Sequence, residues 1–189
     1  KVVGNTLFDK SLKRIVSYIP NNKKTTYTVP SNVKEIGKDA FKGNKNLKTI
    51  KMSDSVTKVG ICAFAKTTKL RNVKLSNKIT FWGDKAFNKS NIYNVKSNWK
   101  DSILYCDNAV VSCKNKAKTA NIKKGSKYIL NNAFFHSSIS KLTIPNGVTY
   151  IGESAFEKCN KLTKVDVPNS VTQMNKFAFY DCSSLSKVK

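Results

Sequence analysis

The chain has 189 residues and a mass of 21.1 kDa, enough for one domain or two small ones with a buried core. Its 35 lysines and arginines outnumber 11 aspartates and glutamates, which gives a formal charge of +24. The hydrophobic content of 40% excludes a disordered polyelectrolyte, and apolar runs of only a few residues exclude a transmembrane helix. A single histidine and scattered carboxylates argue against most hydrolase and metal-site designs.

The dipeptide Ala-Phe marks an internal repeat. It ends at Phe41, Phe64, Phe87, Phe134, Phe156 and Phe179. The steps between these positions are 23, 23, 47, 22 and 23 residues, so the long step predicts one degenerate unit between Phe87 and Phe134. Apolar residues in each unit follow the spacing L-x-x-L-x-L, which is typical of leucine-rich repeats.

A single unit of this length cannot bury its own apolar face, so the units must stack. The alternation Ile50-Lys51-Met52 predicts a strand with one face buried. Stacking places phenylalanine on phenylalanine one strand spacing apart, roughly 4.8 Å, around a continuous core. The sequence therefore predicts a leucine-rich repeat solenoid. We expect a single elongated domain over 1–189, with β-rich right-handed repeats of about 23 residues and short helical turns at the Ala-Phe segments.

Taken in chain order, the repeat is interrupted twice. Residues 1–24 and about 98–119 alternate apolar and polar residues around a turn-prone centre, which predicts hairpin-like inserts. Residues 25–97 and 120–189 hold the regular repeats. The chain starts without an apolar stretch of signal length and ends inside a strand without a polar cap. We therefore expect a fragment of a longer chain.

One position of the repeat is held by residues that tolerate a positive φ, which predicts a tight bend there. These residues are Gly37, Gly60, Gly83, Gly152 and Asn175. Leu130 departs from the rule, so an altered bend is expected in its unit.

The segment Ile151-Gly152-Glu153-Ser154-Ala155-Phe156-Glu157-Lys158-Cys159, followed by Leu162, Val165, Val167 and Pro168, resembles the BspA-like leucine-rich repeat family. The resemblance covers about residues 25 to 189. It implies a secreted or cell-surface protein of a bacterium or protist, without shared catalytic residues. The implied function is non-enzymatic attachment to protein partners, such as host extracellular matrix or surface proteins, or to other microbes. We expect a monomer that needs no cofactor or metal.

The high positive charge supports a second hypothesis, retention at an anionic polymer such as teichoic acid or a sulfated glycan. Outward-facing lysines of the main strand are predicted to form two ladders. One contains Lys51, Lys74 and Lys96, and the other contains Lys141, Lys164 and Lys187. A solvated, aggregation-resistant surface is the alternative interpretation. Nucleic acid is disfavoured, because the chain has two arginines and no known binding motif.

Aromatic residues define a further ladder, in which each precedes a buried strand residue. Its members are Phe81, Tyr128 and Tyr150. Exposed aromatic side chains suit protein interfaces, but these rings could equally pack against neighbouring loops.

The cysteines are scattered, and none forms a C-x-x-C pair, which disfavours a zinc site. Cys159 and Cys182 share a repeat position with small residues, so both are predicted to be buried fillers. Cys62 is expected at a turn or exposed. Cys106 and Cys113 flank the second insert, and the sequence leaves a disulfide between them open. The single histidine, His136, is not expected to be catalytic.

Overall fold

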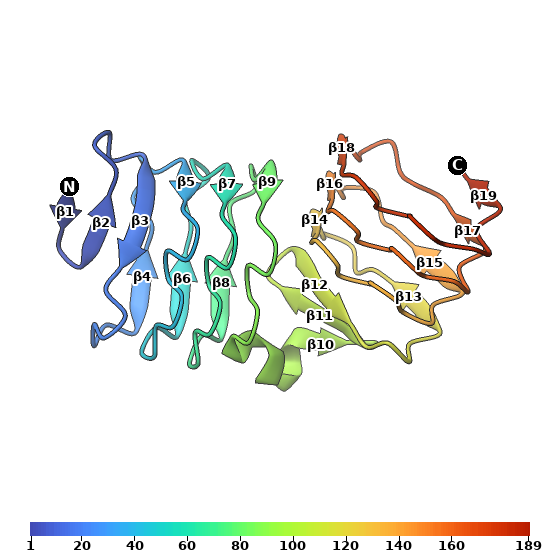
Figure 1. Ribbon diagram of the computed structural model, residues 1–189, viewed down its shortest axis with the longest axis horizontal. Helices are drawn as coiled ribbons and strands as arrows, with labels where there is room; N and C mark the ends of the chain where they lie inside the picture. Colours follow the sequence, from blue (N-terminus) through green and yellow to red (C-terminus); the bar gives the residue numbers. More distant parts are fainter. The chain divides into compact units, whose positions relative to one another are not determined.

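Each regular repeat forms one coil with two short strands and a turn that carries the Ala-Phe dipeptide. In the computed structural model, which describes all 189 residues, successive coils stack so that equivalent strands pair in parallel (Figure 1). This confirms the predicted leucine-rich repeat solenoid, but the Ala-Phe segments form turns and not the short helical turns that were expected. The contacts divide the coils between two compact units, Lys1–Lys96 and Ser97–Lys189.

The first unit holds nine strands and two parallel stacks. The strands are β1 (Val2–Val3), β2 (Thr6–Phe8), β3 (Arg14–Tyr18), β4 (Thr26–Thr28), β5 (Glu35–Ile36), β6 (Thr49–Lys51), β7 (Lys58–Val59), β8 (Asn72–Lys74) and β9 (Phe81–Trp82). Strands β1, β2 and β3 form an antiparallel meander, and β3 then pairs in parallel with β5, which begins the row β5-β7-β9. A second sheet has the order β4-β6-β8, seen beside the first row in Figure 1.

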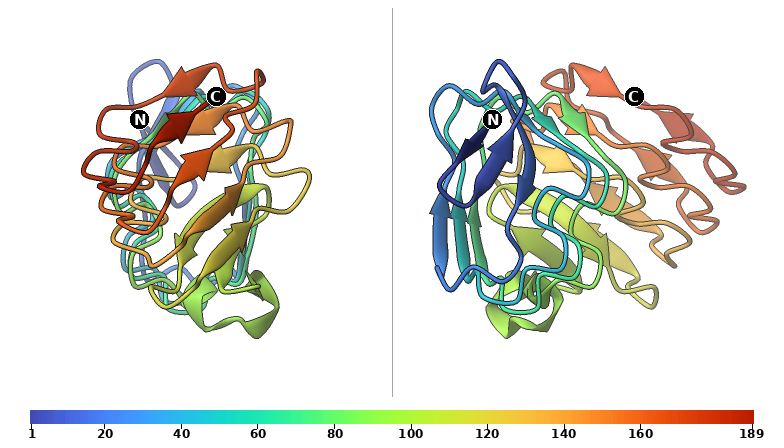
Figure 2. Two further views of the ribbon diagram at one scale, coloured as in Figure 1. Left: turned by 90° about the vertical axis from the view of Figure 1, so that its right-hand side faces the viewer. Right: turned by 60° about the vertical axis from the view of Figure 1, so that its left-hand side comes forward.

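The second unit follows the same plan. Two 3-10 helices lie at the boundary between the units. Helix η1 (Asn91–Asn94) belongs to the end of the first unit, and η2 (Lys96–Asn98) spans the boundary. The strands of the second unit are β10 (Trp99–Lys100), β11 (Ile103–Cys106), β12 (Ala109–Cys113), β13 (Thr119–Asn121), β14 (Tyr128–Ile129), β15 (Lys141–Thr143), β16 (Tyr150–Ile151), β17 (Lys164–Val165), β18 (Gln173–Met174) and β19 (Lys187–Val188). Strands β10, β11 and β12 are antiparallel, and β12 begins the parallel row β12-β14-β16-β18. The pairs β13-β15 and β17-β19 form the other side of the coils, as Figure 2 shows from two directions.

The Ala-Phe turns of successive coils are hydrogen-bonded to one another and place their phenylalanine rings in the core of each unit. Their phenylalanine N–H donates to the alanine carbonyl oxygen of the next coil, as from Phe64 to Ala86 at 2.8 Å. The rings consequently stack at about one strand spacing, as the sequence predicted. Ring centroids are 5.5 Å apart for Phe41–Phe64, 5.1 Å for Phe64–Phe87, 4.9 Å for Phe134–Phe156 and 4.9 Å for Phe156–Phe179.

The position three residues after each phenylalanine holds a small polar or sulfur-containing side chain. Thr67 donates from Oγ1 to the carbonyl oxygen of Phe64 at 2.7 Å, and Cys159 donates from Sγ to that of Phe134 at 3.2 Å. Cys159 is fully buried, and Cys182 is half-buried in the last coil. These small residues are fillers that also satisfy backbone carbonyl groups inside the coils.

The predicted bend at the shared glycine position is wrong. Gly37, Gly60, Gly83 and Gly152 do not have a positive φ. The left-handed residue lies two positions later, where φ is between 53° and 61° at Asp39, Cys62, Lys85, Asn132, Ser154 and Phe177. The turn therefore bends through non-glycine residues, and glycine is needed for another reason.

That reason is the close approach of the preceding coil. A Cβ atom at Gly60 would lie 2.5 Å from the backbone nitrogen of Lys38, and one at Gly152 would lie 2.5 Å from that of Asn131. Real Cβ atoms essentially never come so close to a backbone atom. Glycine at this position allows the coils to stack without a side chain between their backbones.

We predict that Gly60→Ala lowers the free energy of unfolding by about 3 kcal/mol, because the added methyl group must separate two coils. Gly43 is a matched control, since its φ is +73° and nothing lies within 4 Å of a Cβ built there. Gly43→Ala should cost only about 1 kcal/mol through its backbone conformation. Urea unfolding of both variants measures the difference, and equal losses would contradict the close-approach explanation.

Candidate binding surfaces

The outward face of β4, β6 and β8 is a polar surface of the first unit. Its two columns are Thr26–Thr49–Asn72 and Thr28–Lys51–Lys74, both in register across the parallel strands. Lys51 and Lys74 are exposed and form no ion pair with a carboxylate. This strand face therefore presents hydroxyl and amide groups beside two uncompensated positive charges.

Lys96, the third lysine predicted for this ladder, lies elsewhere. It begins the 3-10 helix η2 and is exposed, but it belongs to no strand that pairs with β8. The physical reason lies in the turn before it. The chain turns as the 3-10 helix η1, with Ile92 buried in it, instead of extending as a strand beside β8.

The second lysine ladder lies in the second unit and is partly neutralised. Lys164 and Lys187 are in register on β17 and β19, and Lys141 occupies the equivalent place on β15. All three are exposed. The Lys164 Nζ lies 3.1 Å from a carboxylate oxygen of Asp166, so its charge is compensated within its own coil.

Phe81 lies in a column of charged residues on β3, β5, β7 and β9. The register aligns Arg14 with Glu35, Glu35 with Lys58, and Lys58 with Phe81. The Arg14 Nε lies 3.0 Å from a carboxylate oxygen of Glu35. Phe81 is 48% exposed at the end of this column, where Gly60 helps to line a cavity of about 210 Å³. Sequence reasoning missed Arg14, because it lies in the first irregular insert rather than in a regular repeat.

Tyr128 and Tyr150 correct the prediction of an exposed aromatic ladder. They are in register on β14 and β16, but only 0% and 3% of their surface is exposed. Consecutive residues of β11, β14 and β16 are all buried, so both faces of this part of the sheet are covered. The alternative that these rings pack against neighbouring chain segments is the correct one for the two tyrosines.

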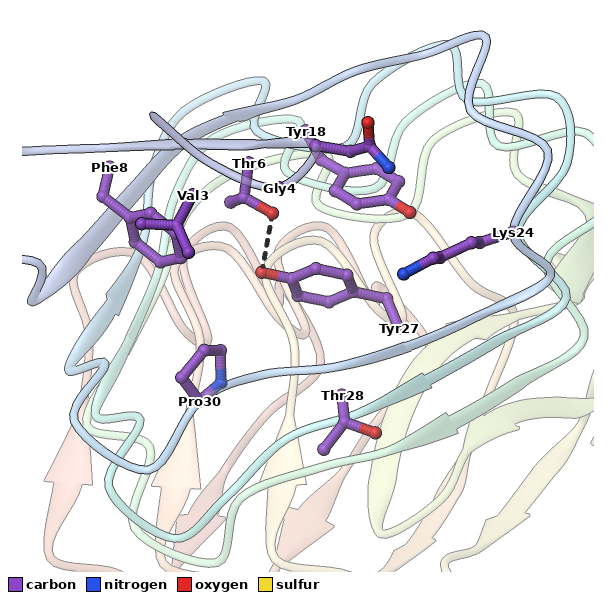
Figure 3. Close-up of a pocket in the computed structure, with 10 residues that line it drawn as sticks. Val3, Gly4, Thr6, Phe8, Tyr18, Lys24, Tyr27, Thr28 and Pro30 are labelled. Atoms are coloured by element: carbon purple, nitrogen blue, oxygen red, sulfur yellow. Dashed lines mark hydrogen bonds between the residues drawn. The ribbon is translucent and has the colours of Figure 1, made fainter. Parts of the chain in front are cut away.

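A small cavity of about 220 Å³ lies beside the first meander (Figure 3). Its wall contains the rings of Tyr18 and Tyr27, and Lys24 points into it. Thr6 donates from Oγ1 to the Tyr27 hydroxyl oxygen at 3.1 Å. Burial raises the pKa of Tyr27 above its usual value, so its phenol stays protonated and can donate a hydrogen bond.

No group of three or more histidine, cysteine, aspartate or glutamate side chains in residues 1–189 could hold a metal ion. All five cysteines are free, and β11 and β12 place Cys106 opposite Ala109 and Cys113 opposite Ile103. The hairpin therefore separates the two thiols, and no disulfide joins Cys106 to Cys113. His136 is exposed at a turn position with φ of 55°. No helix is long and apolar enough to cross a membrane.

Comparison with protein families places the chain in a known group of repeat proteins. The BspA type leucine rich repeat region matches residues 13–124 and 105–189, in six copies. The chain belongs to this family. No curated protein matches it.

Several solved structures are similar to the chain at low identity. They include a leucine-rich repeat protein from Eubacterium ventriosum, at 23% identity and a TM-score of 0.49, covering 96% of this chain and 50% of that one. A leucine rich cell surface protein from Faecalibacterium prausnitzii has 22% identity and a TM-score of 0.48, covering 99% and 38%. The pneumococcal vaccine antigen PcpA has 19% identity and a TM-score of 0.44, covering 97% and 34%. The chain thus spans between about a third and a half of these proteins.

Thiol labelling tests the environment of the cysteines. Burial raises the pKa of Cys113 to about 11 and raises that of Cys106 further, so at pH 9 both remain protonated and shielded in the folded chain. Cys62 is half-buried at a turn, so we expect iodoacetamide to modify it first. Mass spectrometry of peptides identifies the order, and urea should expose Cys106 and Cys113. Rapid labelling of Cys106 without urea would show that the hairpin is not packed as described.

Proposed function

We propose that the chain is a non-enzymatic, surface-exposed adhesion module that binds protein partners on host or microbial surfaces. The observation that carries this proposal is Phe81, a half-exposed aromatic ring at the end of the charged column Arg14–Glu35–Lys58. An aromatic anchor bordered by polar and charged groups is the composition that protein interfaces favour.

The solenoid supports the same function physically. Stacked coils hold equivalent side chains at a fixed spacing, so the Phe81 column and the β4-β6-β8 face are preorganised before a partner arrives. Membership of the BspA type family supports a secreted or cell-surface location and attachment to host extracellular proteins. We propose that the module acts as a monomer without cofactor.

Replacement of the aromatic anchor tests this proposal. Phe81→Ala should weaken binding to a captured extracellular matrix protein by about 2 kcal/mol, or roughly thirtyfold, because the ring is the buried centre of the contact. Surface plasmon resonance against a panel of matrix proteins at physiological salt measures the loss.

Phe135→Ala is the matched control, since Phe135 is similarly exposed but lies in the second unit. It should leave the affinity unchanged. No saturable binding to any matrix protein would count against the adhesion function. Binding that survives Phe81→Ala would count against this site alone.

A second candidate function is retention at an anionic cell-wall polymer or sulfated glycan. The observation that favours it is the in-register pair Lys51 and Lys74, which has no carboxylate partner on the β4-β6-β8 face. Each exposed lysine contributes little alone, but a long polymer can contact several at once.

We predict that Lys51→Glu with Lys74→Glu weakens binding of a long polyanion by about tenfold, because two attractive contacts become repulsive. Lys96→Glu should weaken it less than Lys74→Glu does, since Lys96 lies outside the strand face. Affinity chromatography on immobilised heparin and on teichoic acid, with circular dichroism as a check of folding, measures both effects. A folded double variant that elutes with the parent would refute this assignment.

A further inference from the structure

A basic cavity in the second unit lies outside the surfaces described above. It has a volume of about 330 Å³ and is lined by Lys116, Lys118, Ser138, Ser140 and Lys161. Its lining contains three cationic groups, two hydroxyl groups and no carboxylate. We call these five residues the lysine–serine notch.

Three successive coils contribute to the notch, and backbone hydrogen bonds join the first two. Ser138 donates its N–H to the Asn115 carbonyl oxygen at 2.9 Å, and Ser140 donates its N–H to the Lys118 carbonyl oxygen at 2.8 Å. The residue between each outward pair is buried. These anchors are Ala117, Ile139 and Leu162, one in each coil. The backbone beneath the notch is therefore fixed by the core of the unit.

The notch exists because the middle coil carries short side chains. Serine stands at both outward positions of that coil, whereas long lysine side chains stand on the coils at either side. Lys116 and Lys161 occupy the same repeat position two coils apart, which corresponds to roughly 10 Å between their backbones. That separation leaves room for a tetrahedral oxyanion between two ammonium groups.

The first unit shows that lysine alone does not create this arrangement. Lys48 donates its N–H to the Thr25 carbonyl oxygen at 2.7 Å, the same contact that Ser140 makes with Lys118. The middle coil of the first unit thus has Lys48 where the notch has Ser140. At this repeat position of the middle coil, a long charged lysine side chain stands in place of the short serine side chain.

The charges of the notch are uncompensated within the chain. None of its lysines forms an ion pair, in contrast to Lys164, which pairs with Asp166 in its own coil. Ser140 donates from Oγ to the Lys118 carbonyl oxygen at 3.2 Å, and the Ser138 hydroxyl remains able to donate to a ligand. Ammonium and hydroxyl donors around one cavity are complementary to an oxyanion.

We propose that the lysine–serine notch binds a sulfate or phosphate ester group carried on a polymer chain. The inference goes beyond the proposed protein-binding function and does not rest on it. It also differs from attraction to the strand face, because it places a short ligand at three lysines that converge on one cavity, while Lys51 and Lys74 lie in the other unit.

The test uses short oligomers that can occupy one notch but cannot cover both units. A sulfated heparin hexasaccharide and a glycerol phosphate hexamer are titrated into the whole chain at physiological salt by isothermal calorimetry. The variant Lys116→Gln/Lys118→Gln/Lys161→Gln should bind the preferred oligomer about tenfold more weakly. The charge-matched variant Lys10→Gln/Lys45→Gln/Lys78→Gln removes three exposed lysines of the first unit and should bind like the parent.

A third variant separates shape from charge. Ser138→Leu keeps every lysine but fills part of the notch with a larger side chain, so it should also weaken binding. Circular dichroism verifies that each variant is folded. Loss with the sulfated oligomer alone identifies a sulfated glycan as the source, and loss with the phosphate oligomer alone identifies a phosphate polymer.

Equal weakening by both triple variants would show attraction to bulk charge and overturn the site. Unchanged binding by a folded notch variant would also overturn the site. The same holds if a hyaluronan hexasaccharide, whose only charged groups are carboxylates, binds the notch equally tightly. These results leave the adhesion proposal unaffected, because that proposal is tested at Phe81 with protein partners.

Discussion

The close approach of successive backbones is the constraint on which the rest of the structure depends. Coils can stack at about one strand spacing only where no side chain stands between them, and Gly60 and Gly152 provide that clearance. The same spacing brings the phenylalanine rings to between 4.9 and 5.5 Å and aligns each Ala-Phe turn for backbone hydrogen bonds. The core of each unit therefore follows from many similar short contacts between neighbouring coils.

Stacking also turns every repeat position into a column of side chains on the surface. A column becomes chemically distinct through the residues that happen to share it: Arg14 meets Glu35 on one side, and Lys51 meets Lys74 on another. Neighbouring charges within a coil then modify each column, as Asp166 does for Lys164. Binding specificity in this architecture is therefore set by which side chains the coil register aligns, while the backbone stays nearly constant.

In both units, an irregular antiparallel segment pairs with one end of the parallel row of strands. Each unit begins with three antiparallel strands, and the last of these offers its free edge to the first parallel coil. This arrangement covers one end of each parallel row with hydrogen-bonded strands, which is what an exposed sheet edge requires. The cysteines of the second hairpin are packed as apolar fillers, since burial keeps both thiols protonated.

The sequence alone determined the repeat, its period, the phenylalanine stack and the outward position of Lys51 and Lys74, because each follows from periodicity. Only the tertiary structure decided which outward positions reach solvent. Tyr128 and Phe81 share a repeat position, yet one is buried and the other exposed, since burial depends on what covers a sheet face and not on the alternation along a strand. The lysine–serine notch likewise arises from three adjacent coils, whose side-chain lengths combine only after stacking.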